Sequence, residues 1–146
     1  MIAMALPRVA SPRAYRRPQK KNSQGCFFFR SGVVSLCANG GKPLAKQFII
    51  DASEVASGKT RPVTVGEHKL LVCHSGSDFY VVQNQCSHAM ARLTGGKLRG
   101  HKIFCPLHSA PFDLRDGSPL GAPATEPICA YATTVEDGKV YAVLPD

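Results

Sequence analysis

The 146-residue chain has no tryptophan and no long apolar run, and its first 50 residues contain neither Asp nor Glu. No apolar stretch approaches the roughly 18 residues that a membrane-spanning helix needs, so the sequence predicts a soluble protein. After residue 60, no window of about eleven residues shows helical periodicity. These absences exclude a helical membrane protein and a helix-rich domain, and they predict a single all-β domain.

The absence of acidic residues makes the charge uneven along the chain. Residues 1–50 carry nine Lys and Arg, whereas the chain from Asp51 onward carries nine basic and ten acidic residues, so +9 and −1 sum to the formal net charge of +8. A basic, acid-free N-terminus followed by mixed charge is typical of a cleaved organelle-targeting segment. We expect residues 1–38 to be a disordered transit peptide, residues 39–45 a linker, and residues 46–146 the folded domain.

Three prolines in the N-terminal segment bear on the organelle. Pro7, Pro12 and Pro18 would interrupt the amphipathic helix that mitochondrial import prefers, because each proline removes a helix hydrogen bond. The stretch VVSLCANGG (33–41) resembles a plastid processing site. The sequence therefore predicts the plastid stroma, with the mitochondrion as the alternative. A basic tail that binds nucleic acid or a membrane is the competing interpretation of this segment, but the nearly neutral folded part predicts no nucleic-acid partner.

Short β-rich runs separated by turn residues fill the rest of the chain. The runs expected to form strands are 47–50, 60–65, 68–74, 79–83, 97–98, 102–104, 128–136 and 139–144. Residues 51–58, DASEVASG, are expected to form one helical turn with Asp51 or Ser53 as its N-cap. Residues that carry chemistry must then lie in loops between strands, where they can converge without interrupting a sheet.

Two of these loops each contain one cysteine and one histidine. QCSHAM places Cys86 and His88 one residue apart, and CPLHSAP places Cys105 and His108 two residues apart. Thiolates together with imidazoles favour zinc or iron-sulfur chemistry over magnesium or calcium. The four donors predict a metal site, and their residue types alone leave both a structural zinc and an iron-sulfur centre open.

The order of the four donors separates these alternatives. A Cys2His2 zinc finger takes both cysteines from one hairpin and both histidines from a helix, whereas here each loop supplies one of each. The pattern C-x-H, a gap of sixteen residues, then C-P-x-H resembles the signature of Rieske iron-sulfur proteins. The resemblance continues through FDLRDGSPLG and the final hairpin, and it covers roughly residues 46–146. It implies a Rieske fold of antiparallel sheets in which two loops bind a [2Fe-2S] cluster.

The resemblance also implies a role for each donor. In a Rieske cluster one iron takes two cysteine thiolates and the other takes two histidine nitrogens. Cys86 and Cys105 would bind the inner iron, and His88 and His108 would bind the outer, more exposed iron.

Four positions depart from the high-potential members of the family. Ala91 and Leu107 stand where those members have two cysteines that form a disulfide across the cluster. Ala110 and Phe112 stand where they have a serine and a tyrosine that donate hydrogen bonds to sulfur. Because such hydrogen bonds raise the reduction potential, we expect a low potential for this class.

The resemblance implies a soluble one-electron carrier that passes electrons from a reductase to an oxygenase or another acceptor. No histidine follows His108 in this sequence, so we expect neither the mononuclear iron site of a Rieske oxygenase nor another catalytic site in this chain, and we leave open whether it is a component of an oxidoreductase. Two other functions remain open. One is an accessory subunit resembling the small subunit of nitrite reductases, and the other is a zinc-stabilised interaction module.

The remaining chemically active residues have simpler explanations. Cys73 and Cys129 lie in apolar runs and are expected to be core residues. His68, His74 and His101 lie at strand ends or turns and are expected to be solvated. The pair Gly95-Gly96 lacks the Lys-Ser/Thr and the helix of a phosphate-binding loop, so we interpret it as a turn.

Overall fold

The computed structural model describes residues 26–27, 36–37 and 44–145. Its elements, in chain order, are β1 (Cys26–Phe27), β2 (Leu36–Cys37), β3 (Leu44–Asp51), the 3-10 turn η1 (Ala52–Glu54), β4 (Thr60–Val65), β5 (His68–Ser75), β6 (Asp78–Gln83), β7 (Lys97–Arg99), β8 (Lys102–Phe104), β9 (Pro111–Asp113), β10 (Ala130–Tyr131), β11 (Thr133–Glu136) and β12 (Lys139–Pro145). The prediction of an all-β fold made of antiparallel sheets is confirmed.

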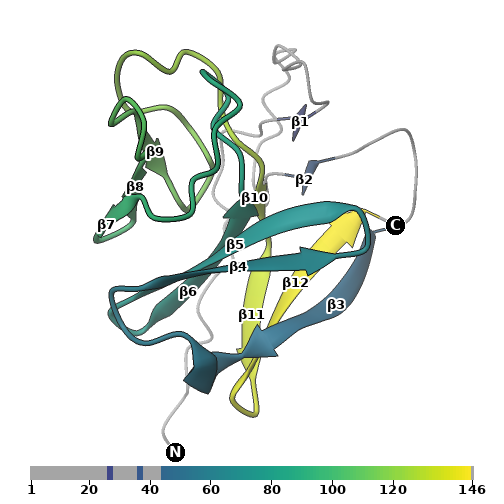
Figure 1. The fold of residues 1–146 in the computed structure, drawn as a ribbon. Helices are drawn as coiled ribbons and strands as arrows, with labels where there is room; N and C mark the ends of the chain where they lie inside the picture. Colours follow the sequence, from purple (N-terminus) through teal and green to yellow (C-terminus); the bar gives the residue numbers. More distant parts are fainter. Residues whose placement is uncertain (1–25, 28–35, 38–43, 146) are drawn as a thin grey trace, which may run out of the picture.

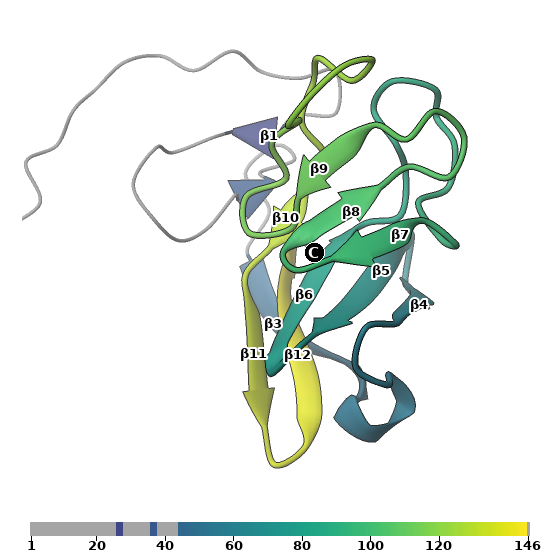
Figure 2. The same ribbon diagram turned by 90° about the vertical axis from the view of Figure 1, so that its left-hand side faces the viewer.

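Three antiparallel sheets make up the domain (Figures 1 and 2). The central sheet has the order β10-β6-β5-β4, a second sheet has the order β11-β12-β3, and a small third sheet has the order β7-β8-β9. Figure 1 shows the third sheet with its long loops above the other two. Strands β1 and β2 pair with each other in a separate two-stranded sheet.

The residues of β5 show that the central sheet is covered on both faces. Its run LLVC is fully buried, and successive side chains of a strand point to opposite faces. Leu70 and Val72 join the core shared with the β11-β12-β3 sheet. Leu71 and Cys73 join a second core beneath the β7-β8-β9 sheet. A continuous apolar run is therefore what this position requires, since neither face meets solvent.

The second core, which we call the loop core, leads directly to the predicted metal ligands. Its buried members are Leu71, Cys73, Val82, Cys86, Leu93, Ile103, Cys105, Ala110, Phe112, Leu114, Ala124, Ile128 and Ala130. Both predicted cysteine ligands thus belong to an apolar layer supported by the central sheet. Cys73 is fully buried in the same layer, as expected, and burial raises the pKa of its thiol to about 12.

The turn between β11 and β12 has two residues, fewer than the three to five expected for this Gly-containing hairpin. The hairpin between β11 and β12 turns at Asp137 and Gly138, whose φ angles are 49° and 72°. Two successive left-handed residues are what a two-residue hairpin turn needs, and Asp-Gly is a favoured pair for it. The predicted helical turn is present as η1, although the Asp51 side chain makes no capping hydrogen bond.

Some expectations fail in detail. Strand β9 was not predicted, because its three residues begin with Pro111 inside a segment rich in loop residues.

Two half-buried histidines that were expected to be solvated have partners in the protein. His74 Nδ1 lies 2.6 Å from the Val55 carbonyl oxygen, and its ring stacks on Phe79. His68 Nε2 lies 3.0 Å from the Pro145 carbonyl oxygen. Tertiary neighbours supply these partners, so local sequence did not indicate them.

The predicted transit peptide and linker lie mostly outside the described residues, which include only β1, β2 and the first two residues of β3 from that part of the chain. Because β3 begins at Leu44 and pairs with β12, the last two residues of the predicted linker belong to the folded domain. Among the described residues, no helix is both long enough and apolar enough to span a membrane.

Candidate metal centre

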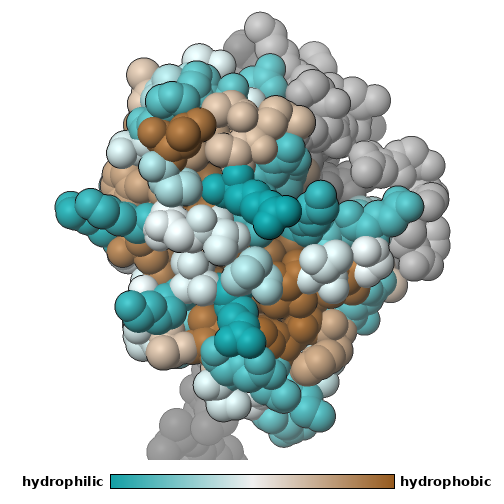
Figure 3. All heavy atoms as spheres, viewed as in Figure 1, coloured by the Kyte–Doolittle hydropathy of each residue, from teal (hydrophilic) through white to brown (hydrophobic). Residues whose placement is uncertain are grey.

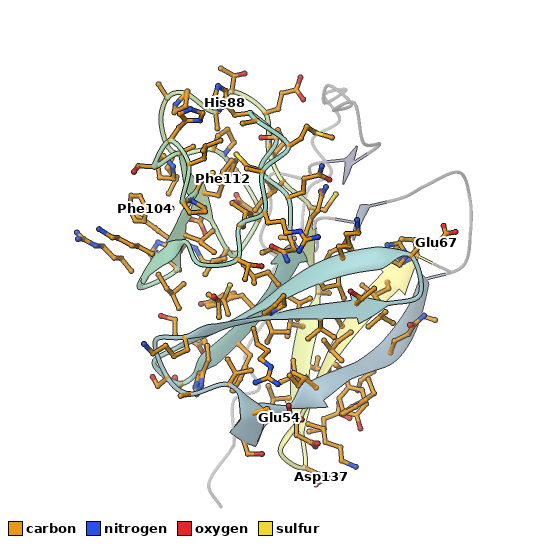
Figure 4. All side chains as sticks on the ribbon, in the orientation of Figure 1. Glu54, Glu67, His88, Phe104, Phe112 and Asp137 are labelled. Carbon is orange, nitrogen blue, oxygen red and sulfur yellow. The ribbon has the colours of Figure 1, made fainter. Side chains whose placement is uncertain are left out.

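Two loops meet at the upper end of the molecule in Figure 1. We call residues 86–91 loop 1, which follows β6, and residues 105–110 loop 2, which joins β8 to β9. The imidazole rings of His88 and His108 have centroids 5.1 Å apart and planes inclined by 83°. Both histidines are exposed, and Figure 4 shows His88 at this end of the molecule. The two loops therefore bring the predicted histidine ligands together at the surface.

The two cysteines of these loops are buried. Cys86 is 0% exposed and Cys105 is 2% exposed. Burial raises the pKa of the Cys86 thiol, while backbone N–H groups of His88 and Ala89 donate to its sulfur and act in the opposite direction. The neighbouring Cys105 thiol, within hydrogen-bond reach of Cys86, raises this pKa further. A bound metal would reverse this tendency, because coordination deprotonates a thiol.

Each loop forms a backbone turn, and the two turns have the same pattern of hydrogen bonds. In loop 1, the Cys86 N–H donates to the Ala91 carbonyl (2.7 Å) and the Met90 N–H donates to the Cys86 carbonyl (3.0 Å). In loop 2, the Cys105 N–H donates to the Ala110 carbonyl and the Ser109 N–H donates to the Cys105 carbonyl, both at 2.9 Å. The fifth residue of each loop is left-handed, with φ of 54° at Met90 and 56° at Ser109. Each cysteine is thus fixed at the start of the same tight turn.

Buried polar contacts hold the strands next to loop 2. The carboxylate of Asp113, in β9, accepts hydrogen bonds from Arg115 Nη2 (2.7 Å), Arg115 Nε (3.0 Å) and the Arg115 N–H (2.9 Å). Burial alone raises the pKa of Asp113, but the hydrogen bonds from Arg115 outweigh it, so the pKa is lower than usual. His101 Nε2 lies 3.8 Å from the same carboxylate. Asp113 therefore remains charged and ties β9 to the following turn.

Loop 1 is attached differently. The Ser87 hydroxyl donates to the Glu126 carbonyl at 2.5 Å. The buried side chain of Asn84, just before the loop, accepts from the Thr94 N–H (3.0 Å) and hydroxyl (2.9 Å). Side-chain hydrogen bonds to other loops position loop 1, whereas loop 2 is held by paired strands on both sides.

This donor set suits two metal ions better than one. Among the residues that the structure describes, no three His, Cys, Asp or Glu side chains lie close enough to bind one metal ion together. The donors form two pairs instead: buried, adjacent thiols and exposed, adjacent imidazoles. A cluster with one iron held by thiolates and one by imidazoles needs this division.

The Rieske [2Fe-2S] domain model matches residues 45–143 of the sequence. The chain belongs to the Rieske [2Fe-2S] domain family. The family's cofactor is a [2Fe-2S] cluster. The prediction of a [2Fe-2S] cofactor is therefore confirmed, and the match does not support the zinc alternative.

Relatives of this Rieske protein come from bacterial dioxygenase systems. It is 36% identical over 91 residues to ferredoxin CarAc of Metapseudomonas resinovorans, covering 62% of this chain and 85% of that protein. It is 33% identical over 99 residues to the 3-phenylpropionate/cinnamic acid dioxygenase ferredoxin subunit of Photorhabdus laumondii, covering 67% and 93%. A solved complex of reduced oxygenase and oxidised ferredoxin in carbazole 1,9a-dioxygenase contains a chain that is 33% identical, with a TM-score of 0.63 over 67% of this chain and 92% of that chain.

These relatives correct the predicted location. Ferredoxins of bacterial dioxygenase systems are not plastid proteins, which overturns the expectation of the plastid stroma and of its mitochondrial alternative. A basic, acid-free segment was too general a signal, because it describes charge and not a sorting machinery. Cleavage of residues 1–38 stays a prediction.

Sequence reasoning missed the residues that shape the Rieske loops without binding metal. Met90 and Ser109 gave no signal, because neither residue type is favoured at positive φ. Asp113 was noted only as part of a family motif, although its buried carboxylate organises the end of loop 2. Only the equal offset of Met90 and Ser109, four residues after each cysteine, could have indicated a shared turn.

Proposed function

We propose that this protein is a one-electron carrier whose cluster is bound by Cys86, Cys105, His88 and His108, and that it transfers electrons from a reductase to an oxygenase. The observation that carries the proposal is the division of donors between a buried thiol pair and an exposed imidazole pair. When bound, the cluster supplies reversible one-electron chemistry. The protein's own contribution is to bury one side of the site and to expose the other to a partner.

The loop core excludes water from the thiol side. Leu93, Ile103 and Phe112 are all 0% exposed and pack in the same cluster of residues as the two cysteines. A low dielectric around the thiolates disfavours added negative charge, and hydrogen bonds to the sulfurs offset this effect. Because Ala110 and Phe112 contribute no hydroxyl, we propose a potential at the low end of the Rieske range.

The imidazole side is where a partner would dock. Each loop exposes one large apolar side chain beside its histidine: Met90 is 63% exposed in loop 1, and Leu107 is 59% exposed in loop 2. Figure 3 shows apolar spheres among polar ones at this upper end of the molecule. An apolar rim around two exposed rings would exclude water on docking and bring the donor and acceptor centres close together.

The relatives' names support an oxygenase as the acceptor, since they name ferredoxins of dioxygenase systems. An accessory role without a cluster is disfavoured because all four donors are present and gathered at one end of the domain. We also propose that the redox domain begins with β3 at Leu44, two residues before the boundary predicted from the sequence, and that the residues before β3 link it to a separate segment, which the change in charge balance near Asp51 supports.

Analysis of the purified full chain tests the proposal. Iron, acid-labile sulfide and zinc are measured after anaerobic purification, and the cluster is then titrated between its two redox states. We expect equal iron and sulfide and a reversible one-electron wave. Zinc without sulfide would end the proposal, and so would a cluster that survives replacement of both His88 and His108 by alanine with an unchanged spectrum.

A further inference from the structure

An open groove of about 570 Å³ lies beside the cluster loops and is lined by residues 58–60 and 94–99. Its first wall is the turn that leads into β4. Its second wall is the segment that connects Leu93, in the loop core, to the end of β7. Strand β7 pairs with β8, and β8 leads directly into Cys105. The groove is therefore connected through the backbone to the supports of both loops.

Positive charge dominates the lining. Lys59, Lys97 and Arg99 are exposed, and no Asp or Glu lines the groove. In the described part of the chain, the ion pairs involve Lys46, Arg61, His101 and Arg115, so none of the three groove cations is neutralised by a carboxylate. Lys102, directly opposite Arg99 in the hairpin, adds a further exposed cation. Unpaired cations on both walls of the groove favour a ligand with several negative charges.

Gly95 and Gly96 line the groove without side chains. A Cβ atom on Gly96 would lie 2.2 Å from the Phe104 carbonyl oxygen, so the backbone here rests directly on the end of β8. Gly95 has φ of 88°, which disfavours any larger residue. No side chain rises between the cationic walls at these two positions. The turn predicted for Gly95-Gly96 thus leaves room for a ligand to approach the backbone.

The borders of the groove suit an extended chain. Strand β4 is at one edge of the central sheet, and β7 is at one edge of the third sheet in the described part of the chain. Edge strands present backbone N–H and C=O groups to a further extended segment. Figure 4 shows Glu54 and Asp137 at the end of the molecule opposite His88, and neither residue lines the groove. Figure 3 shows hydrophilic side chains projecting at the left edge, where Figure 1 places β7.

We propose that this groove binds an extended acidic segment of the protein partner, with partner carboxylates paired to Lys59, Lys97 and Arg99. The inference rests on the proposed electron-carrier function and adds an electrostatic contact to the apolar contact of Met90 and Leu107. Long-range attraction at the groove would orient the carrier during approach, and the apolar rim would then complete the docking. Two contacts of different chemistry fix the orientation better than either alone.

The test uses the full chain with its cluster and a hexaglutamate peptide as the probe. Binding is followed by the backbone amide resonances of Gly95, Gly96 and Lys97. The groove variant is Lys97→Glu with Arg99→Glu. The control is Lys69→Glu with Lys139→Glu, which changes the net charge equally at exposed positions that do not line the groove. We expect saturable shifts at the groove, affinity that falls with added salt, roughly tenfold weaker binding in the groove variant, and little change in the control.

Three results would overturn the inference: no shift at the groove, equal weakening in both double variants, or binding of inorganic tripolyphosphate without binding of hexaglutamate. Iron, sulfide and reversible reduction are measured on the same samples. A sample that lacks the cluster counts against the proposed function, whereas an intact cluster without peptide binding counts against the groove alone.

Discussion

The two cluster loops have the same backbone turn but are supported in different ways. Both begin at a buried cysteine, close with the same two hydrogen bonds and place a left-handed residue four positions after the cysteine. Their histidines nevertheless differ in offset, at the third position of loop 1 and the fourth of loop 2. Loop 2 is bounded by paired strands, whereas loop 1 depends on the hydrogen bond that Ser87 donates and on those that the Asn84 side chain accepts.

The turn and the histidine offset have different effects in the two loops. The shared turn positions the thiols, because the cysteine N–H and C=O are both fixed within it. The unequal offset sets the direction of the imidazoles, whose planes are inclined by 83°. Equivalent thiols and non-equivalent histidines can therefore arise from one kind of turn. The different supports imply that damage near loop 2 spreads through a sheet, whereas damage near loop 1 acts through single hydrogen bonds.

The largest expected effect comes from removing a thiol from either loop. Cys86→Ser and Cys105→Ser should each abolish the cluster, because a hydroxyl is a poor ligand for iron in this setting. Cys73→Ala, which removes a third buried thiol of the same core, should keep it. Iron and sulfide content and the visible spectrum measure the result. Retention of a normal cluster in either serine variant would remove that cysteine from the ligand set.

Asp113→Asn tests the sheet-bound support of loop 2. The charged hydrogen bonds to Arg115 lower the pKa of Asp113 below its ordinary value of 3.8, so their stabilisation is present above that pH and is lost as the pH falls through the lower, folded-state pKa. At pH 7 we expect a loss of about 1–2 kcal/mol, because Arg115 is exposed and its contribution is screened. Urea unfolding measures the loss.

The matched control is Glu67→Gln, which removes an exposed carboxylate in the turn between β4 and β5. It should change the free energy of unfolding by less than about 0.5 kcal/mol. Equal effects of the two substitutions at pH 7 would contradict a supporting role for Asp113.

Hydroxyl groups added near loop 2 should change the reduction potential more than a hydroxyl group added in loop 1. The wild type should lie below about 0 mV, within a family range of roughly −150 to +300 mV. Phe112→Tyr and Ala110→Ser should each raise the potential by about 40 mV, the equivalent of a net hydrogen bond of about 1 kcal/mol for one electron. Ala91→Ser, at the matching position of loop 1, should have a smaller effect. Protein-film voltammetry is the measurement, and a wild-type midpoint above about +150 mV would show that the missing hydroxyl donors were the wrong guide.

The smallest effect concerns the left-handed residues. Met90→Gly and Ser109→Gly should each stabilise the protein by about 0.5 kcal/mol, because relief of positive-φ strain slightly exceeds the entropy cost of glycine. Met90→Ala and Ser109→Ala should give no such gain. Thermal unfolding of the four variants tests whether the two turns are energetically alike, and a loss of stability in only one glycine variant would break the equivalence.

Much of the fold was predictable because its strands have local signals. The alternating runs in β11 and β12 and the Asp-Gly turn between them define a hairpin without any tertiary information. Strand β9 was missed because three residues that begin with Pro111 have no periodicity, and only pairing with β8 makes them a strand. His68 and His74 were expected to be solvated, but each ring lies within hydrogen-bond distance of a backbone carbonyl. The partner of His68 is Pro145, which is distant in sequence, and the partner of His74 is Val55, which lies in a separate turn.

The sequence by itself determined the all-β class, the four predicted donors and the family, because residue types at fixed spacing in two loops carry that chemistry directly. Tertiary structure alone decided that the thiols are buried and the imidazoles exposed, that both loops use one turn, and that unpaired cations line a groove beside them. Burial and charge pairing depend on residues that are remote in the chain. Val82 and Phe112, for example, belong to the same core although they lie far apart in the sequence, and no local pattern encodes their shared burial.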